Sequence, residues 1–218
     1  MKTEEKVLAL FRECNAVWFH SGDPKTSHAE LSSGLCSDGY FNCSKVFQYP
    51  KYCQRLAGML VKKLLKQEGL RDINIDWVVG PAEAGIKLAH EVAKPFGAKA
   101  GFTEKDPKNP KKMIWDRFNI SEGSTVLQVE DAMASGWTSL ESRRAINREN
   151  KGKVRFLDII GAIILRPQKL PFSCDGIKVV ALVEKEIRVF RPEECPLCEQ
   201  GSPRYRPKSH WAELTGKK

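Results

Sequence analysis

The sequence lacks any long apolar run. No stretch of its 218 residues approaches the roughly 20 consecutive apolar residues that a membrane-spanning helix needs. The first residues, Met1 to Lys6, also lack the apolar segment of a secretory signal. These absences argue against a membrane protein and against a secreted one, and we expect a cytoplasmic protein.

A disulfide framework is not expected either. The seven cysteines are an odd number and lie scattered along the chain, which fits a reducing compartment. Hydrophobic residues make up 41% of the sequence, enough for a substantial core. This length and composition suit one α/β domain.

The net charge is +9 at pH 7. Such an excess suits either nucleic acid or a small polyanion. The basic run 204–208 has only Tyr205 and Trp211 as aromatic neighbours. Proteins that bind single-stranded nucleic acid combine basic residues with several aromatic side chains on which the bases stack. We therefore favour a small polyanionic substrate over nucleic acid, and interpret the run as a surface or subunit contact.

The stretch 125–139, TVLQVEDAMASGWTS, organises the chain. Its β-branched beginning predicts a buried strand that ends at Glu130 and Asp131. The small residues 132–136 predict a tight loop, and Thr138 and Ser139 carry side chains that cap helices. The predicted order is strand, acidic pair, loop and helix.

This order suits a sugar phosphate. Ligands of open α/β sheets lie beyond the carboxyl ends of the strands. The N–H groups of a loop that enters a helix bind anions. Carboxylates only accept hydrogen bonds, so the acidic pair fits the hydroxyls of a sugar diol. The simpler interpretation is an ordinary turn with surface acids.

The string VEDAMASGWTS resembles the loop that binds 5-phosphoribosyl 1-diphosphate (PRPP) in type I phosphoribosyltransferases. That resemblance implies one domain over residues 1–218, an α/β fold with a central, mostly parallel sheet flanked by helices and a small N-terminal hood. Within it we expect an N-terminal helix and hood hairpin at 1–48, a core at 49–190 and a tail at 191–218. Ala134 and Trp137 depart from the family pattern, which has threonine and glycine there. The resemblance assigns Glu130 and Asp131 to the ribose hydroxyls, and Ala132, Ala134, Ser135, Gly136, Trp137, Thr138 and Ser139 to the loop around the 5′-phosphate.

The segment GPAEAG at 80–85 follows a predicted strand at 75–79 and precedes a predicted helix. This is a second arrangement that suits an anion, although such a turn is most often only a turn. The equivalent loop of the family binds pyrophosphate, and this form resembles its orotate branch. The resemblance therefore places Ala82 and Glu83 at the pyrophosphate.

Residues 103–112 follow a predicted strand at 98–102 and are rich in charge, with two prolines. We expect an exposed, mobile loop, either a solvated connector or a lid. Its flanking residues resemble the mobile catalytic loop of the orotate enzymes. That resemblance implies catalytic roles for Lys105 and Arg117, with Lys105 also at PRPP. A closing cationic loop would neutralise pyrophosphate and exclude water.

Residues 28–42 predict two short strands around a turn at Gly34, and they resemble the N-terminal hairpin of orotate phosphoribosyltransferases. A plain hairpin is the alternative. Ser32 stands where many of those enzymes have a substrate-contacting lysine.

Arg166 follows a predicted strand at 154–165 and matches the arginine that binds the base in the orotate enzymes. Its planar guanidinium suits an anionic ring. The alternative is an ordinary arginine at a strand end. The implied base-binding residues are Arg166, Ala134, Tyr40 and Phe41.

The tail carries Cys195 and Cys198 in a C-x-x-C arrangement, which is half of a zinc site. Cys174 and His210 would complete it only by folding back. Relatives in the orotate branch have a similar segment that requires no metal, and we assign no metal ligand. Elsewhere, apolar periodicity predicts helices at 3–19 and 50–69, the second ended by Gly69, and a strand at 177–183.

The resemblance implies an orotate phosphoribosyltransferase of pyrimidine nucleotide biosynthesis, with PRPP and a nitrogenous base as substrates. It also implies a homodimer. Mg²⁺ is the expected cofactor because it accompanies substrate phosphates. Catalysis would depend on positioning and electrostatics, with Lys105, Arg117 and Asp131 as catalytic residues. Two alternatives stay open: a purine-type phosphoribosyltransferase, and a non-catalytic regulator of the same fold that binds nucleotide or RNA.

Overall fold

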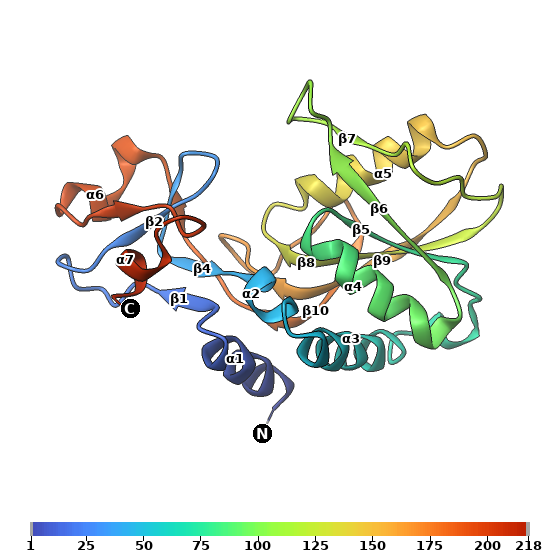
Figure 1. Ribbon diagram of the computed structural model, residues 1–218, viewed down its shortest axis with the longest axis horizontal. Coiled ribbons are helices and arrows are strands. Elements are labelled where there is room, and N and C mark those ends of the chain that lie inside the picture. The colour runs from blue at the N-terminus through green and yellow to red at the C-terminus, as the bar shows by residue number, and fades with distance from the viewer. Residues whose placement is uncertain (1, 217–218) are drawn as a thin grey trace.

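A six-stranded sheet forms the centre of the protein in the computed structural model, which describes residues 2–216 (Figure 1). Five neighbouring strands are parallel, and β7 at one edge runs antiparallel to β6. The predicted central, mostly parallel sheet is therefore confirmed. The strands, in spatial order, are β10 (Lys178–Glu184), β9 (Arg155–Leu165), β8 (Thr125–Met133), β5 (Trp77–Pro81), β6 (Lys99–Lys105) and β7 (Met113–Ile114).

Helices cover both faces of this sheet because its central strands are apolar on both sides. Along β5, Val78 packs into the core beneath α3 and α4, whereas Trp77 and Val79 pack on the opposite side against α5. This alternation follows from the two-residue period of a strand. The helices are α1 (Thr3–Glu13), α2 (Cys43–Phe47), α3 (Pro50–Leu64) and α4 (Ala84–Ala93) on one face and α5 (Trp137–Glu149) on the other, with 3₁₀ turns at Leu70–Asp72 and Lys94–Phe96.

A smaller lobe stands beside the sheet and joins the two ends of the chain (Figure 1, blue and red). Its four-stranded sheet has the order β11–β3–β2–β12, so strands near residues 30 and 200 are direct neighbours. The predicted domain boundaries stay a prediction, but hood and tail share one sheet. The elements are β1 (Val17–Phe19), β2 (His28–Glu30), β3 (Cys36–Ser37), β4 (Gly39–Phe41), β11 (Val189–Phe190), a 3₁₀ turn (Pro192–Glu194), α6 (Pro196–Glu199), β12 (Arg204–Tyr205) and α7 (Trp211–Thr215).

Two helices end earlier than their sequences predict. The helix expected over 3–19 stops at Glu13, because Asn15 adopts φ +47° and residues 17–19 pair with β4 instead. The helix expected over 50–69 stops at Leu64, and Gly69 with φ +74° starts the next 3₁₀ turn. No helix within residues 2–216 has the length and apolarity required to span a bilayer.

Candidate active site

The acidic pair lies inside β8 rather than at its end, because this strand continues to Met133. Glu130 is only 5% exposed and accepts a hydrogen bond of 2.5 Å from Ser139 Oγ at the start of α5. Burial and the neighbouring Asp131 raise the pKa of Glu130 to about 8. Burial also raises the pKa of Asp131, a half-buried residue. Neither carboxylate forms an ion pair with a lysine or arginine of the described chain.

The turn between β8 and α5 depends on Gly136. This residue adopts φ +74°, and a Cβ atom on it would lie 2.5 Å from Cys174 Sγ. Gly136, and not Thr138 or Ser139, occupies the N-cap of α5, so the predicted side-chain cap is wrong. Both residues instead belong to the first helical turn, whose N–H groups have no partner within a helix and are available to an anion.

A cavity of about 1040 Å³ lies where this turn meets the smaller lobe. Ala134, Ser135 and Thr138 line it from the β8–α5 side, and Arg166 lines it from the end of β9. Tyr40 and the hood residues 31–33 form the opposite wall. The structure thus brings the predicted phosphate loop and most of the predicted base-binding residues to one cavity.

Arg166 lines this cavity and carries one buried donor that has no partner within residues 2–216. That donor is its Nη1 atom. Burial lowers the pKa of Arg166, and nearby Tyr40, Cys43 and Asp131 act in the opposite direction. Burial also raises the pKa of the Tyr40 hydroxyl, which favours its neutral, donating form. The site therefore holds a cation and a hydroxyl without a counter-anion in contact with Nη1.

Several predicted residues lie outside the cavity wall. Phe41 follows Tyr40 on β4, so its ring points the other way and packs edge-on against the buried Phe11 and against Phe19, which is 37% exposed. Its predicted contact with the base stays a prediction. Trp137 is 39% exposed at the start of α5. Glu130, Asp131, Gly136 and Ser139 are not among the residues that line the cavity, and Asp131 is close enough to affect the pKa of Arg166.

The 80–85 turn lies at the same edge of the sheet as the phosphate loop, because β5 and β8 are parallel neighbours. The peptide bond between Ala82 and Glu83 is cis. A Cβ atom on Gly80 would lie 2.5 Å from the carbonyl oxygen of Gly85. Only glycine at position 80 therefore fits this turn without displacing the backbone. Ala82 N–H donates to the Thr103 carbonyl at 2.7 Å, which anchors the turn to β6.

The charged segment after residue 103 forms a β-hairpin and is not a loop along its whole length. Strand β6 continues to Lys105, and β7 returns beside it. The tip projects away from the sheet (Figure 1). Arg117 Nε donates to Glu104 at 2.7 Å, and neither Lys105 nor Arg117 lines the cavity. Their catalytic roles and the closure of this hairpin stay predictions.

Basic residues of the tail also line the cavity, which the sequence did not reveal. Arg206 and Lys208 come from the run interpreted as a surface or subunit contact, and Lys169 follows Arg166. Arg206 pairs with Glu30 of the hood at 2.9 Å. The run carries no sequence signal for this placement, because it reaches the cavity only through the pairing of β12 with β2.

The phosphoribosyl transferase domain family matches residues 52–195 of the chain. The chain belongs to this family. Two curated relatives, both named orotate phosphoribosyltransferase, are similar over almost their whole lengths. The protein of Caldanaerobacter subterraneus subsp. tengcongensis is 35% identical over 210 residues, covering 94% of this chain and 97% of that one. The protein of a Thermoanaerobacter species is 36% identical over 207 residues, with the same coverage of both.

Solved structures of phosphoribosyltransferases share the fold. The orotate phosphoribosyltransferase of Aeropyrum pernix superposes with a TM-score of 0.57 at 17% identity, covering 82% of this chain and 93% of that one. The Mycobacterium tuberculosis enzyme of the same name gives a TM-score of 0.54 at 15% identity, covering 91% and 98%. The predicted type I fold of this phosphoribosyltransferase is confirmed.

Cys174 and His210, which the sequence offered only by folding back, do not join the tail cysteines. Cys174 packs against Gly136 beneath the phosphate loop, and His210 stacks on Tyr205. Neither belongs to the group of possible ligands around Cys195 and Cys198. The side chains beside that pair are instead His28 and Cys36 of the hood.

Proposed function

We propose that this phosphoribosyltransferase transfers the 5-phosphoribosyl group of PRPP to orotate, giving orotidine 5′-phosphate and pyrophosphate in pyrimidine nucleotide biosynthesis. The observation that carries the proposal is the side chain of Arg166, which lines the cavity and whose buried Nη1 atom has no partner within residues 2–216. A buried donor without a partner is costly, and a ligand carboxylate would satisfy it. Orotate carries such a carboxylate on a planar ring. Both relatives described above support this substrate by their names.

PRPP would bind across the edge where β5 and β8 end. Its 5′-phosphate would accept hydrogen bonds from the main chain of residues 134–138, at the positive end of α5. Its ribose hydroxyls would donate to Asp131, with Glu130 behind it. Its pyrophosphate would lie against the turn at Ala82 and Glu83. The adjacency of the two strand ends supports this orientation.

The base would occupy the part of the cavity between Arg166 and Tyr40. Paired to its carboxylate, the guanidinium of Arg166 would hold the ring nitrogen below C1 of the ribose. The C1–O bond to pyrophosphate then breaks as the C1–N bond to the base forms, through an oxocarbenium-like state as in other glycosyl transfers. No side-chain nucleophile takes part, so the protein contributes positioning and charge.

The leaving group requires positive charge. Lys105 and Arg117 would supply it when the β6–β7 hairpin closes, and closure would also exclude water. Mg²⁺ fits the site as a companion of the substrate, because two carboxylates lie there without a lysine or arginine ion pair in the described chain. Bound to the substrate phosphates, it would neutralise charge on pyrophosphate. Asp131 and Glu130 are the residues that would help to hold it.

We also propose a homodimer in which this hairpin serves the neighbouring subunit. The support is that Lys105 and Arg117 do not line the cavity of their own chain. Cytoplasmic location stays a prediction from the sequence.

The test is an assay of pyrophosphate release with PRPP, Mg²⁺ and one base at a time. Orotate, adenine, hypoxanthine and guanine would be compared at equal concentration. Turnover with orotate alone is the expected result. Turnover with a purine base would replace the proposal with the purine-type alternative. Binding of PRPP without turnover of any base would favour a non-catalytic regulator.

A further inference from the structure

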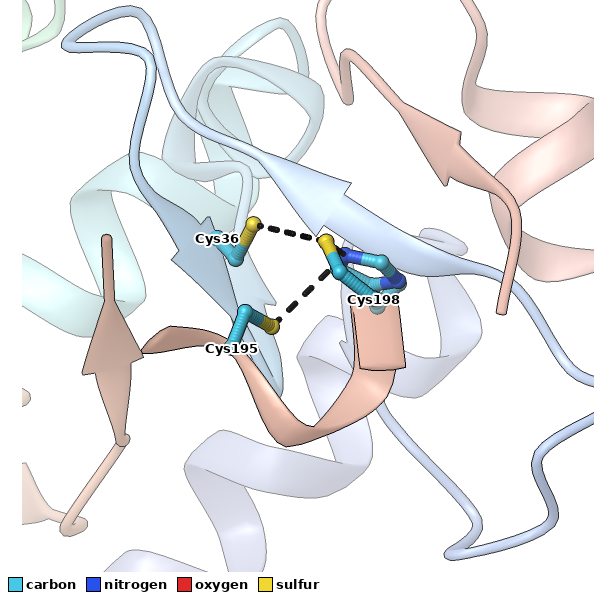
Figure 2. A group of neighbouring side chains, drawn as sticks. Cys36, Cys195 and Cys198 are labelled. Atoms are coloured by element: carbon cyan, nitrogen blue, oxygen red, sulfur yellow. Dashed lines mark hydrogen bonds between the residues drawn. The ribbon is translucent and has the colours of Figure 1, made fainter. Parts of the chain in front are cut away.

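Three cysteines and one histidine converge in the smaller lobe, far from the phosphate loop in sequence. Cys36 lies on β3, Cys195 precedes α6 and Cys198 lies within it (Figure 2). His28 on β2 completes the group. The sulfur and nitrogen atoms of the four side chains all lie within 4.8 Å of one another. We propose that this cluster binds one structural Zn²⁺ ion and so joins the C-terminal tail to the N-terminal hood.

The distances match tetrahedral coordination. Zinc–sulfur bonds of about 2.3 Å and zinc–nitrogen bonds of about 2.0 Å place two ligand sulfurs about 3.8 Å apart, and a sulfur and a nitrogen about 3.5 Å apart. The Sγ atoms of Cys36 and Cys198 are 3.6 Å apart. The Nε2 atom of His28 is 3.4 Å from Cys198 Sγ and 3.9 Å from Cys195 Sγ. Three of the six ligand–ligand distances thus lie near their tetrahedral values, and all six are within 4.8 Å.

The histidine is oriented for a metal by its second ring nitrogen. Ser202 Oγ donates its only hydrogen to the Thr26 carbonyl at 2.6 Å. At its 2.8 Å contact with His28 Nδ1, the same oxygen must therefore accept, so Nδ1 carries the hydrogen. Nε2 then has a free lone pair, directed at the cysteines. A hydrogen bond that fixes the tautomer in this way is the usual support of a zinc-binding histidine.

Burial and charge agree with a closed, structural site. His28 and Cys36 are fully buried, Cys195 is 3% exposed, and Cys198 is half-buried. Four protein ligands leave no open position for water or substrate, which distinguishes structural from catalytic zinc. Three thiolates and one Zn²⁺ ion carry a net negative charge. Arg204 supplies a neighbouring cation, with Nη1 4.0 Å from Cys36 Sγ.

The lobe also needs such a connection. Its strands are only two or three residues long, and its buried apolar cluster consists of Cys36, Cys195 and Leu197. A core of this size contributes little stability, and small units commonly rely on a metal or disulfides. A Cys36–Cys198 disulfide would require the sulfurs to approach to about 2.05 Å and would leave Cys195 and His28 unused. Zinc uses all four.

The decisive measurement is the metal content of the full-length protein, purified without a metal-affinity tag or chelator. Elemental analysis should find about one zinc per chain. The double variant Cys195→Ser/Cys198→Ser should contain less than about a tenth of that. Cys14→Ser, which alters a half-buried thiol outside the cluster, is the matched control and should keep its zinc. Wild-type protein that contains no zinc, or contains iron instead, would overturn the proposal.

Two further measurements keep the test decisive if the double variant fails to fold. Cobalt-substituted wild type should show thiolate-to-cobalt charge transfer and tetrahedral visible bands. His28→Cys should keep both, whereas His28→Ala should bind cobalt more weakly and with altered visible bands. Intact mass after denaturation should correspond to seven thiols. A mass lower by two hydrogens would identify a disulfide and contradict the zinc site.

The site would also affect the cavity, because hood and tail supply Ser32, Arg206 and Lys208 to its wall. Zinc removal should therefore raise KM for the base more than KM for PRPP. This second readout rests on the proposed function, whereas metal content does not. Zinc without orotate turnover would uphold the metal site and contradict only the proposed function.

Discussion

Replacement of Glu130 by glutamine should stabilise the substrate-free protein while it weakens PRPP binding. The carboxyl group is 5% exposed and has one hydrogen bond, from Ser139 at 2.5 Å. Asp131 is the next residue, and no lysine or arginine of residues 2–216 forms an ion pair with Glu130. Glutamine keeps the shape and an acceptor for Ser139 but removes the charge.

The size of the expected stabilisation follows from the pKa of Glu130. Burial and Asp131 raise it from 4.5 to about 8 in the folded protein. The group therefore contributes stability below about pH 4.5, and that contribution is lost as the pH rises through about 8. Each pKa unit corresponds to about 1.4 kcal/mol, so the full loss is at most about 5 kcal/mol. Local relaxation and entering water reduce this limit, and we expect about 2 kcal/mol, or roughly 4–8 °C in Tm for a chain of this length.

The assay is thermal unfolding of wild type and Glu130→Gln at about pH 5.5 and about pH 8.5. The Tm of the variant should exceed that of wild type at the higher pH by several degrees, and by a clearly smaller amount at the lower pH. Glu68→Gln removes the same charge from an exposed position and should show no such pH dependence. PRPP with Mg²⁺ should raise the Tm of wild type more than that of the variant. An equal Tm difference at both pH values would refute the argument from burial.

Three other variants test the remaining site residues. Arg166→Gln should lower kcat/KM for orotate roughly 10- to 100-fold with little change in KM for PRPP, because it removes a charged hydrogen bond to the base. Arg144→Gln, at an exposed position of α5, is the control. Equal losses in both variants would contradict the role of Arg166 at the base. Gly136→Ala should cost about 2 kcal/mol or more, because it places a Cβ atom 2.5 Å from Cys174 Sγ at φ +74°; an unchanged denaturation midpoint would show that this turn is not needed. Asp131→Asn and Lys105→Ala should each fold with little activity, but a refolded mixture of the two should recover roughly a quarter of wild-type turnover if sites are shared between subunits. No recovery in a proven mixed dimer would place each hairpin over its own cavity.

The sequence determined the parts that depend on neighbouring residues. A β-branched run followed by acids, small residues and a helix start predicted β8, the phosphate loop and α5, because strand, turn and helix preferences act within a few residues. The same holds for the turn at Gly80 and Gly85. The wrong predictions among these local features concern where strands and helices end. Strand β8 continues past Asp131 because β9 pairs with it as far as Met133. Helix α1 stops early because residues 17–19 pair with β4.

The tertiary structure decided which distant residues meet. The knuckle of Cys195 and Cys198 suggested half of a metal site, but the choice of His28 and Cys36 over Cys174 and His210 follows from the pairing of β2 with β3 and β12. Arg206 reaches the cavity by the same pairing. Alternation along β4 turned Phe41 into the core and left Tyr40 at the cavity. Local sequence does not predict such contacts, because they arise from burial of apolar faces between segments more than 150 residues apart.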